Sequence, residues 1–167
     1  TLTPLVRSRL HSIDDKLIAN WEYKDKRREE WFINREFVLT YMAGPPPKDN
    51  EVIEGRWWGE GKNAEVSLEE DAAKRLNAKI GSQLTIDIQG ILISATVTSI
   101  RKVNWRNMRT NFYMIYSPGA LQGAPLTYVA TVNVPDLKEL ELQHAVVEAL
   151  PNITALSTRD IVNTLEA

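Results

Sequence analysis

Residues 83–97, QLTIDIQGILISATV, decide the fold class of this chain. Apolar and polar residues alternate from Leu84 to Ile88, and the alternation resumes from Ile91 to Val97. A period of two places successive side chains on opposite faces of a strand. The intervening Gln89-Gly90 is typical of a tight turn between two strands. We therefore expect an antiparallel hairpin whose second strand extends toward Val103.

Other segments of the chain also favour strands. The patterns predict strands at 5–13, 31–41, 112–116, 126–134 and 152–156, and a short extended piece at 52–58. Trp31 to Tyr41 shows the clearest alternation outside the hairpin, so it is the strongest strand prediction in the first part of the chain. Asp14-Asp15 is typical of a turn. We expect the mixed charges of residues 22–30 to form a solvated loop or the end of a helix.

Three helices are expected. Residues 67–70, SLEE, match a capping box, in which a serine hydroxyl and a glutamate cap the first turn of a helix. This helix should end at Asn77, a residue that tolerates the backbone of a helix stop. An apolar stripe predicts a second helix over 136–150, which Pro151 ends. Ser157 and Thr158 are candidate caps of a last helix over 159–165.

The order of these elements predicts an α+β fold with two lobes rather than an alternating α/β fold. Three consecutive prolines, residues 45–47, favour a stiff extended segment, which we interpret as a crossing between the lobes. In this interpretation both chain ends, 1–47 and 135–167, build one small lobe. A strand-rich lobe with one helix, 48–134, is inserted between them.

Composition excludes several classes of function. The absence of Cys excludes thiolate nucleophiles, disulfides and cysteine-held metals, and a net charge of −2 argues against nonspecific nucleic-acid binding. The two histidines, His11 and His144, show no ligand spacing, so we interpret them as ordinary side chains. No phosphate-binding loop, nucleophile elbow, metalloprotease motif or dinucleotide fingerprint occurs. We expect no catalytic residue, cofactor or metal, while a hydrolase built from scattered carboxylates stays open.

No apolar run reaches the ~18 residues that a membrane span requires, and no signal peptide is visible. Because the chain begins at Thr1 rather than Met, we expect a fragment or a processed chain of a longer protein.

Two segments combine aromatic and basic residues. Residues 101–112, RKVNWRNMRTNF, hold four basic residues and no acidic one. They fit a contact surface for a lipid head group, an anionic partner or a membrane interface. They fit equally well a structural loop with Trp105 under the sheet. The adjacent Trp57 and Trp58 should face opposite ways, one in the core and the other either toward a partner or partly exposed. The candidate contact residues are Trp57, Trp58, Trp105, Arg106, Arg109 and Phe112.

Two motifs carry a resemblance to a known family. Residues 35–41, REFVLTY, followed by the prolines and by residues 54–58, EGRWW, resemble the large extracytoplasmic domain of FtsX-like ABC transporter permeases. Residues 72–86, AAKRLNAKIGSQLTI, resemble a signature of the MacB-like superfamily, with Asn77 and Ser82 in place of the usual glycine and aspartate. Both replacements tolerate turn conformations.

A third motif narrows the resemblance to a subgroup. Asn104-Trp105 and Asn111-Phe112 match the paired motif of the YbbP-like permeases, to which the chain is most similar. The resemblance implies a porter-like lobe interrupted by a strand-rich, Sabre-like lobe, which agrees with the division proposed above. It also implies a domain between two membrane spans, whose chain ends lie close together.

The resemblance also implies a location and a set of partners. The parent chain would be an integral protein of the bacterial inner membrane, with this domain on its extracytoplasmic, periplasmic face. An ABC ATPase subunit would hydrolyse ATP on a separate chain. A periplasmic lipase or thioesterase, or a lipid, lipoprotein or other hydrophobic envelope substrate, would be the further partner. A freestanding envelope ligand-binding module is the alternative.

Overall fold

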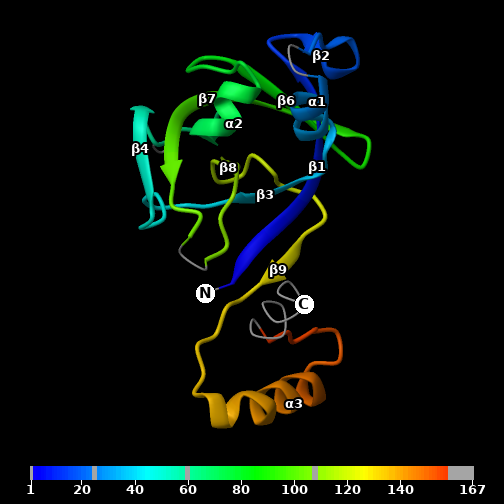
Figure 1. Cartoon of the computed structure of the whole chain (residues 1–167), viewed down its shortest axis with the longest axis vertical. Helices are drawn as coiled ribbons and strands as arrows, with labels where there is room; N and C mark the ends of the chain where they lie inside the picture. The colour runs from blue at the N-terminus through cyan, green and yellow to red at the C-terminus, as the bar shows by residue number, and fades with distance from the viewer. Residues whose placement is uncertain (1, 24–25, 59–60, 107–108, 158–167) are drawn as a thin grey trace. The chain divides into compact units, whose positions relative to one another are not determined.

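The computed structural model describes residues 2–23, 26–58, 61–106 and 109–157. Strands dominate and helices are few, so the α+β expectation is confirmed. Figure 1 shows the elements, with β1 as the long blue strand beside β9. The strands are β1 (Thr3–Ile13), β2 (Lys16–Leu17), β3 (Phe37–Tyr41), β4 (Asn50–Gly55), β5 (Glu65–Glu69), β6 (Gln83–Ile88), β7 (Ile91–Val103), β8 (Met114–Tyr116) and β9 (Thr127–Val129). The helices are η1 (Ile18–Asn20), α1 (Lys26–Asn34), α2 (Glu70–Arg75), η2 (Asp136–Lys138) and α3 (Glu139–Ala149).

Six strands form a closed circuit of hydrogen-bonded neighbours, which runs β1–β3–β8–β5–β7–β6 and returns to β1. The pairs β3–β8 and β5–β7 are parallel, and the other four pairs are antiparallel. Outside the circuit, β2 and β9 pair with β1, and β4 pairs with β7. Because each strand of a closed sheet has a neighbour on both sides, the circuit protects its backbone groups from water.

The hairpin predicted from the sequence is confirmed. β6 and β7 pair antiparallel and are joined by two residues, Gln89 and Gly90. Both have positive φ angles, 52° and 90°, as a type I′ turn requires. The amide of Gly90 donates a hydrogen bond of 2.7 Å to Oδ1 of Asp87, which closes the turn. β7 continues to Val103, as expected.

One hydrophobic core lies inside the circuit. Side chains from all six circuit strands have no exposed surface, and they pack with Phe32 and Ile33 of α1 and with Leu76, which follows α2. The alternation of β1 is also confirmed, because its inward side chains are buried and its arginines are exposed. The strand residues with no exposed surface in this core are Val6, Leu39, Val66, Leu68, Leu84, Ile86, Val97, Met114 and Tyr116.

The strand expected over 31–41 is wrong in its first half. Residues up to Asn34 belong to α1, and only the second half forms β3. The adjacent residues Phe32 and Ile33 are both buried, whereas Trp31 is exposed. Two adjacent buried residues fit the inner side of a helix better than a strand with one buried face. Lys, Arg and Glu, which precede Trp31, are also good helix formers.

The expected capping box is displaced by two residues. Ser67 lies inside β5, where its hydroxyl is buried and accepts a hydrogen bond of 2.7 Å from the hydroxyl of Ser99. Glu69 is the N-cap of α2 instead, since its carboxylate accepts from the amide of Ala72 at 2.9 Å. Because Ser67 and Leu68 pair with β7 and β8, they stay in the extended conformation of a strand, and the helix begins only after them. The stop at Asn77 is confirmed by its positive φ of 49°.

The boundary between compact units does not fall at the prolines. One unit spans Thr1–Val129 and the other spans Ala130–Ala167. β3 before the prolines and β4 after them belong to one sheet, and β1 and β3 are both needed to close the circuit. Residues 1–47 and 48–129 therefore share one fold instead of forming separate lobes. The assignment of 135–167 to a porter-like lobe stays a prediction.

The second unit contains the helix expected over 136–150, with η2 as its first turn and α3 as the rest. The strand expected at 152–156 is wrong, because this segment has no strand partner among the described residues. The helix expected over 159–165 lies outside the described residues. In the described part of the chain, no helix has the length and apolarity needed to cross a membrane.

Candidate contact surface

Trp57 and Trp58 stack on each other instead of facing opposite ways. Their ring centroids lie 3.7 Å apart at an interplanar angle of 29°. The Nε1 of Trp57 donates to the Gly44 carbonyl at 2.8 Å, and that of Trp58 donates to the Met42 carbonyl at 3.1 Å. Both residues follow the end of β4, so the alternation of a strand does not apply to them. The pair fixes the connection that contains the prolines.

Two of the six candidate contact residues lie in the interior. Trp58 and Phe112 are buried and pack with Ile115 in a second, smaller hydrophobic cluster. Because both side chains are buried, neither is accessible to a partner in this structure. Trp57 is half-buried, whereas Trp105 is exposed together with Arg106 and Arg109. For these four residues a contact role stays a prediction.

Arg101 is the one buried arginine among the described residues of the basic segment. Its guanidinium donates to Oδ1 of Asn50 and to the carbonyl of Phe112, both at 2.6 Å. Burial lowers the pKa of Arg101 to about 9, and the negative charge of Glu69 opposes this shift. Hydrogen bonds from a charged donor are short and strong, so Arg101 joins β4 to the segment that leads into β8.

The sequence contains the signal for this burial, although we interpreted Arg101 as part of a surface. Arg101 continues the register of Val97 and Ser99, and all three side chains are buried on β7. A period of two places these positions on one face of the strand. The apolar Val103 extends the same register and is also buried.

The basic loop, residues 104–112 without 107–108, is held by its two asparagines and by an ion pair. Nδ2 of Asn111 donates to the carbonyls of Asn104 at 3.4 Å and Arg109 at 3.3 Å. Nη1 of Arg109 pairs with Oδ2 of Asp49 at 3.3 Å. The two halves of the paired Asn-Trp and Asn-Phe motif therefore contact each other and shape the loop.

Four side chains form what we call the aromatic–arginine cluster: Trp31, Arg35, Trp105 and Tyr113. The guanidinium carbon of Arg35 lies 5.1 Å from the ring centroid of Trp31 and 5.3 Å from that of Tyr113. The rings of Tyr113 and Trp105 are 4.8 Å apart. A chain of close contacts thus links α1 to the basic loop. Exposed fractions are 66% for Trp31 and 45% for Trp105.

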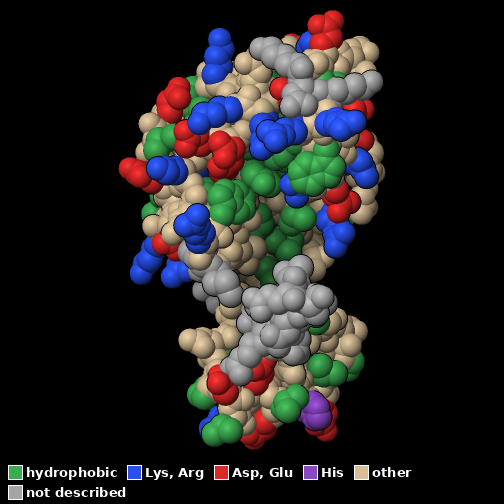
Figure 2. Space-filling view, viewed as in Figure 1, with side chains coloured by type: hydrophobic (Ala, Val, Ile, Leu, Met, Phe, Trp, Pro, Cys, Tyr) green, Lys and Arg blue, Asp and Glu red, His purple; other side chains and the backbone are tan. Residues whose placement is uncertain are grey.

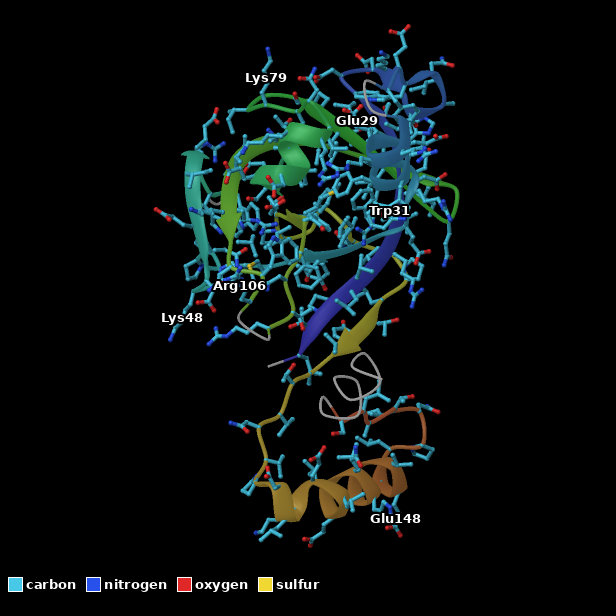
Figure 3. All side chains as sticks on the ribbon, viewed as in Figure 1. Glu29, Trp31, Lys48, Lys79, Arg106 and Glu148 are labelled. Carbon is cyan, nitrogen blue, oxygen red and sulfur yellow. The ribbon has the colours of Figure 1, made fainter. Side chains whose placement is uncertain are left out.

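Trp31 of the cluster lies on the face of the first unit that Figure 3 presents. Figure 2 shows hydrophobic side chains gathered on that face, with Lys and Arg side chains around them. Figure 3 labels Trp31 on α1 and Arg106 on the basic loop in the same view. An exposed group of large aromatic side chains on a folded unit is typical of an interaction site.

Buried rings support the cluster from below. Phe32 packs edge-to-face on Phe37 at 5.4 Å and on Tyr113 at 5.2 Å. The Arg35 guanidinium also lies 5.6 Å from Phe37, and Arg75 lies 5.1 Å above Phe32. These contacts with the core fix the orientation of Tyr113 and of the Arg35 guanidinium.

Trp31, Arg35 and Tyr113 are surface residues that the sequence patterns did not indicate. Its strand assignment placed Trp31 on the same face as Phe37, which is buried. The spacing of Trp31 and Arg35 is a signal for these two residues, because a helix through Trp31 brings the residue four positions later close to it, and Arg35 directly follows α1.

Arg35 differs from the other arginines near it. Within the described ranges, its guanidinium makes no hydrogen bond and no ion pair, and its contacts are the faces of aromatic rings. Those rings attract the positive charge but accept its N–H donors only weakly. The structure brings no group of three or more His, Asp or Glu together as a metal site in the part of the chain that it describes.

Comparison with known proteins identifies the relationship of the chain. No family model matches it. Over 128 residues, 77% of its length, it is 38% identical to the uncharacterised ABC transporter permease YbbP of Escherichia coli (strain K12). The chain is a relative of the ABC transporter permeases. It spans 15% of the length of that permease.

A solved domain described as part of a permease from Porphyromonas gingivalis aligns with 93% of the chain and 65% of its own length. Its sequence identity is 12% and the TM-score is 0.39, so this alignment adds no support to the permease relationship.

Proposed function

We propose that this chain is an extracytoplasmic domain of an FtsX-like or MacB-like ABC transporter permease, closest to the YbbP-like subgroup. The observation that carries the proposal is the 38% identity with the permease YbbP over 128 residues. In this proposal the parent chain lies in the bacterial inner membrane, and the domain lies on its periplasmic face.

The domain acts as a contact and transmission module without a reaction of its own. An ABC ATPase subunit hydrolyses ATP on another chain, and the sequence agrees with this because it contains no phosphate-binding loop. Motion driven by ATP is transmitted to the domain, which carries a surface for another molecule. The exposed rings of Trp31 and Trp105 support such a surface, since large apolar groups on a folded unit favour contact with a partner.

The substrate class in this proposal is a lipid, a lipoprotein or another hydrophobic molecule of the envelope. The basic loop offers the exposed ring of Trp105 beside the exposed Arg106, which suits molecules with an apolar part and an acidic group. A periplasmic lipase or thioesterase is the protein partner in this proposal.

Cysteine labelling in the full-length permease tests the location and the coupling. The chain contains no Cys, so Thr110→Cys on the basic loop adds a unique thiol to the domain. A membrane-impermeant maleimide should label it in intact spheroplasts. Supplying ATP inside vesicles should change its labelling rate by about twofold, because the loop moves with the transport cycle.

Gln122→Cys, at an exposed turn that is not part of the basic loop, serves as the matched control for the ATP effect. Its labelling should be equally accessible from outside but independent of ATP. Labelling of Thr110→Cys only after permeabilisation would place the domain on the wrong side of the membrane. Equal rates with and without ATP would remove the transmission role.

A further inference from the structure

We infer that the aromatic–arginine cluster binds a protein segment that presents a carboxylate to Arg35 between Trp31 and Trp105. This inference rests on the proposed function, in which the domain makes contacts outside the membrane, and it names the chemistry of the partner.

The guanidinium of Arg35 has hydrogen-bond donors that no acceptor among the described residues uses. A guanidinium has five N–H donors in a planar fork, and a carboxylate accepts two of them in parallel. Within the described part of the chain, Arg35 has aromatic neighbours but no such acceptor. Its side chain is half-buried and is held among the rings of Trp31, Phe37 and Tyr113. An acidic side chain from outside would complete this arrangement.

The residue types of the cluster, and the buried ring on which it packs, suit the centre of a protein interface. Trp, Tyr and Arg are the residues that contribute most at the centre of protein interfaces. The cluster contains Trp31, Arg35, Trp105 and Tyr113, and the buried Phe32 supports it through edge-to-face packing. A pre-organised aromatic surface loses little conformational entropy when a partner binds.

The charges around the cluster are of both signs, which favours a protein partner over a bilayer. An anionic membrane surface attracts a concentrated group of basic residues. Here Glu29 and Glu30 of α1 directly follow Arg27 and Arg28. In the basic loop, Arg109 is already paired with Asp49. A rim with both signs of charge matches the polar rim of a protein interface.

A second guanidinium adds to the acidic preference of the site. Arg75 of α2 lies 5.1 Å from the ring of Phe32, and Arg35 lies 6.0 Å from the same ring. Among the described residues neither arginine forms an ion pair. One buried ring therefore holds two unpaired cations near the exposed Trp31.

The test is an NMR titration of the ¹⁵N-labelled 167-residue chain with two unlabelled peptides. One is acetyl-Gly-Ser-Leu-Glu-Trp-Glu-Leu-Ser-Gly-amide, and the other has Gln in place of both Glu. The acidic peptide should shift the indole signals of Trp31 and Trp105 to saturation. The signals of Trp57 and Trp58 should stay in place, because their Nε1 donors are bound to backbone carbonyls.

The Gln peptide should bind about tenfold more weakly, since it cannot form a charge-assisted pair with Arg35. Arg35→Gln should weaken binding of the acidic peptide by a similar factor of about ten in a variant whose circular dichroism shows that it stays folded. Arg56→Gln is the matched control, because Arg56 is an exposed arginine paired with Glu65 outside the cluster. It should leave the affinity unchanged.

Three results would overturn the inference. They are equal affinity for the two peptides, no shift up to about 5 mM acidic peptide, and shifts of Trp31 and Trp105 caused by phosphatidylglycerol vesicles but not by the peptides. The titration is independent of the labelling test for the proposed function. Peptide binding with cytoplasmic labelling would refute the transporter location alone, and periplasmic labelling without peptide binding would refute this inference alone.

Discussion

The guanidinium of Arg101 is buried, yet it determines the position of an exposed loop. It donates to Asn50 at the start of β4 and to the carbonyl of Phe112 at the end of the basic loop. If the side chain were removed, both acceptors would stay buried without a donor. Each unsatisfied acceptor would lower the stability of the fold. Arg101 is therefore a positioning residue for Trp105, which it does not contact itself.

Arg101→Met should lower the free energy of unfolding by about 2–4 kcal/mol, because it removes two buried charge-assisted hydrogen bonds. Urea denaturation measures this change, and the near-UV circular dichroism of Trp105 should weaken in the folded variant. Lys102→Met is the control, since Lys102 is the exposed neighbour on the same strand. It should change the stability by about 0.5 kcal/mol or less. Equal effects of the two substitutions would contradict the positioning role.

At the scale of elements, local sequence patterns succeed where turn residues and strand alternation agree. The hairpin of β6 and β7 is such a case, because Gln89-Gly90 has the turn conformation that the flanking strands require. α1 is the opposite case. Trp31 and Ile33 share the period of two that continues in Phe37, so the pattern predicts one strand through both segments. Burial of Phe32 and Ile33 against the core decides for a helix.

Gln89→Asn should raise the free energy of unfolding by a few tenths to about 1 kcal/mol, because Asn adopts positive φ more readily than Gln and Asn-Gly is favoured in type I′ turns. Gln89→Val should lower it, since a β-branched side chain is strained at the observed φ of 52°. The midpoint of urea denaturation measures both. A turn with a different backbone would give the same stability for the two variants.

At the scale of the whole chain, closure of the sheet depends on residues that are far apart in the sequence. β1 pairs with β6, and β3 pairs with β8. These contacts join residues 1–47 to the following segment, in which we had expected an independent inserted lobe. The core residues also come from both sides of the prolines.

Two fragments distinguish the division at Val129 from the division at the prolines. Residues 1–129 should unfold cooperatively, with a melting temperature within about 5 °C of the full chain, because they contain the complete core. Residues 48–134 should not fold alone, since they lack β1 and β3. Circular dichroism melting curves measure both fragments. Cooperative unfolding of 48–134 would support an inserted lobe.

The candidate surface could be predicted from the sequence only in part. The sequence of the basic segment fits an exposed loop and a Trp105 buried under the sheet equally well, and only the structure places Trp105, Arg106 and Arg109 on the surface. The link from Trp105 through Tyr113 to Arg35 could not be predicted, because Arg35 lies about seventy positions before Trp105 in a segment whose alternation predicts a strand.

The sequence by itself determined the hairpin, the alternation of β1, the stop at Asn77 and the resemblance to permeases. These features depend on the alternation of neighbouring residues and on turn residues, which act over a few positions. Tertiary structure decided that Glu69 caps α2, that the two tryptophans stack and that Arg101 is buried. Each of these depends on which strand or ring lies opposite, and only the closed sheet brings those distant partners together.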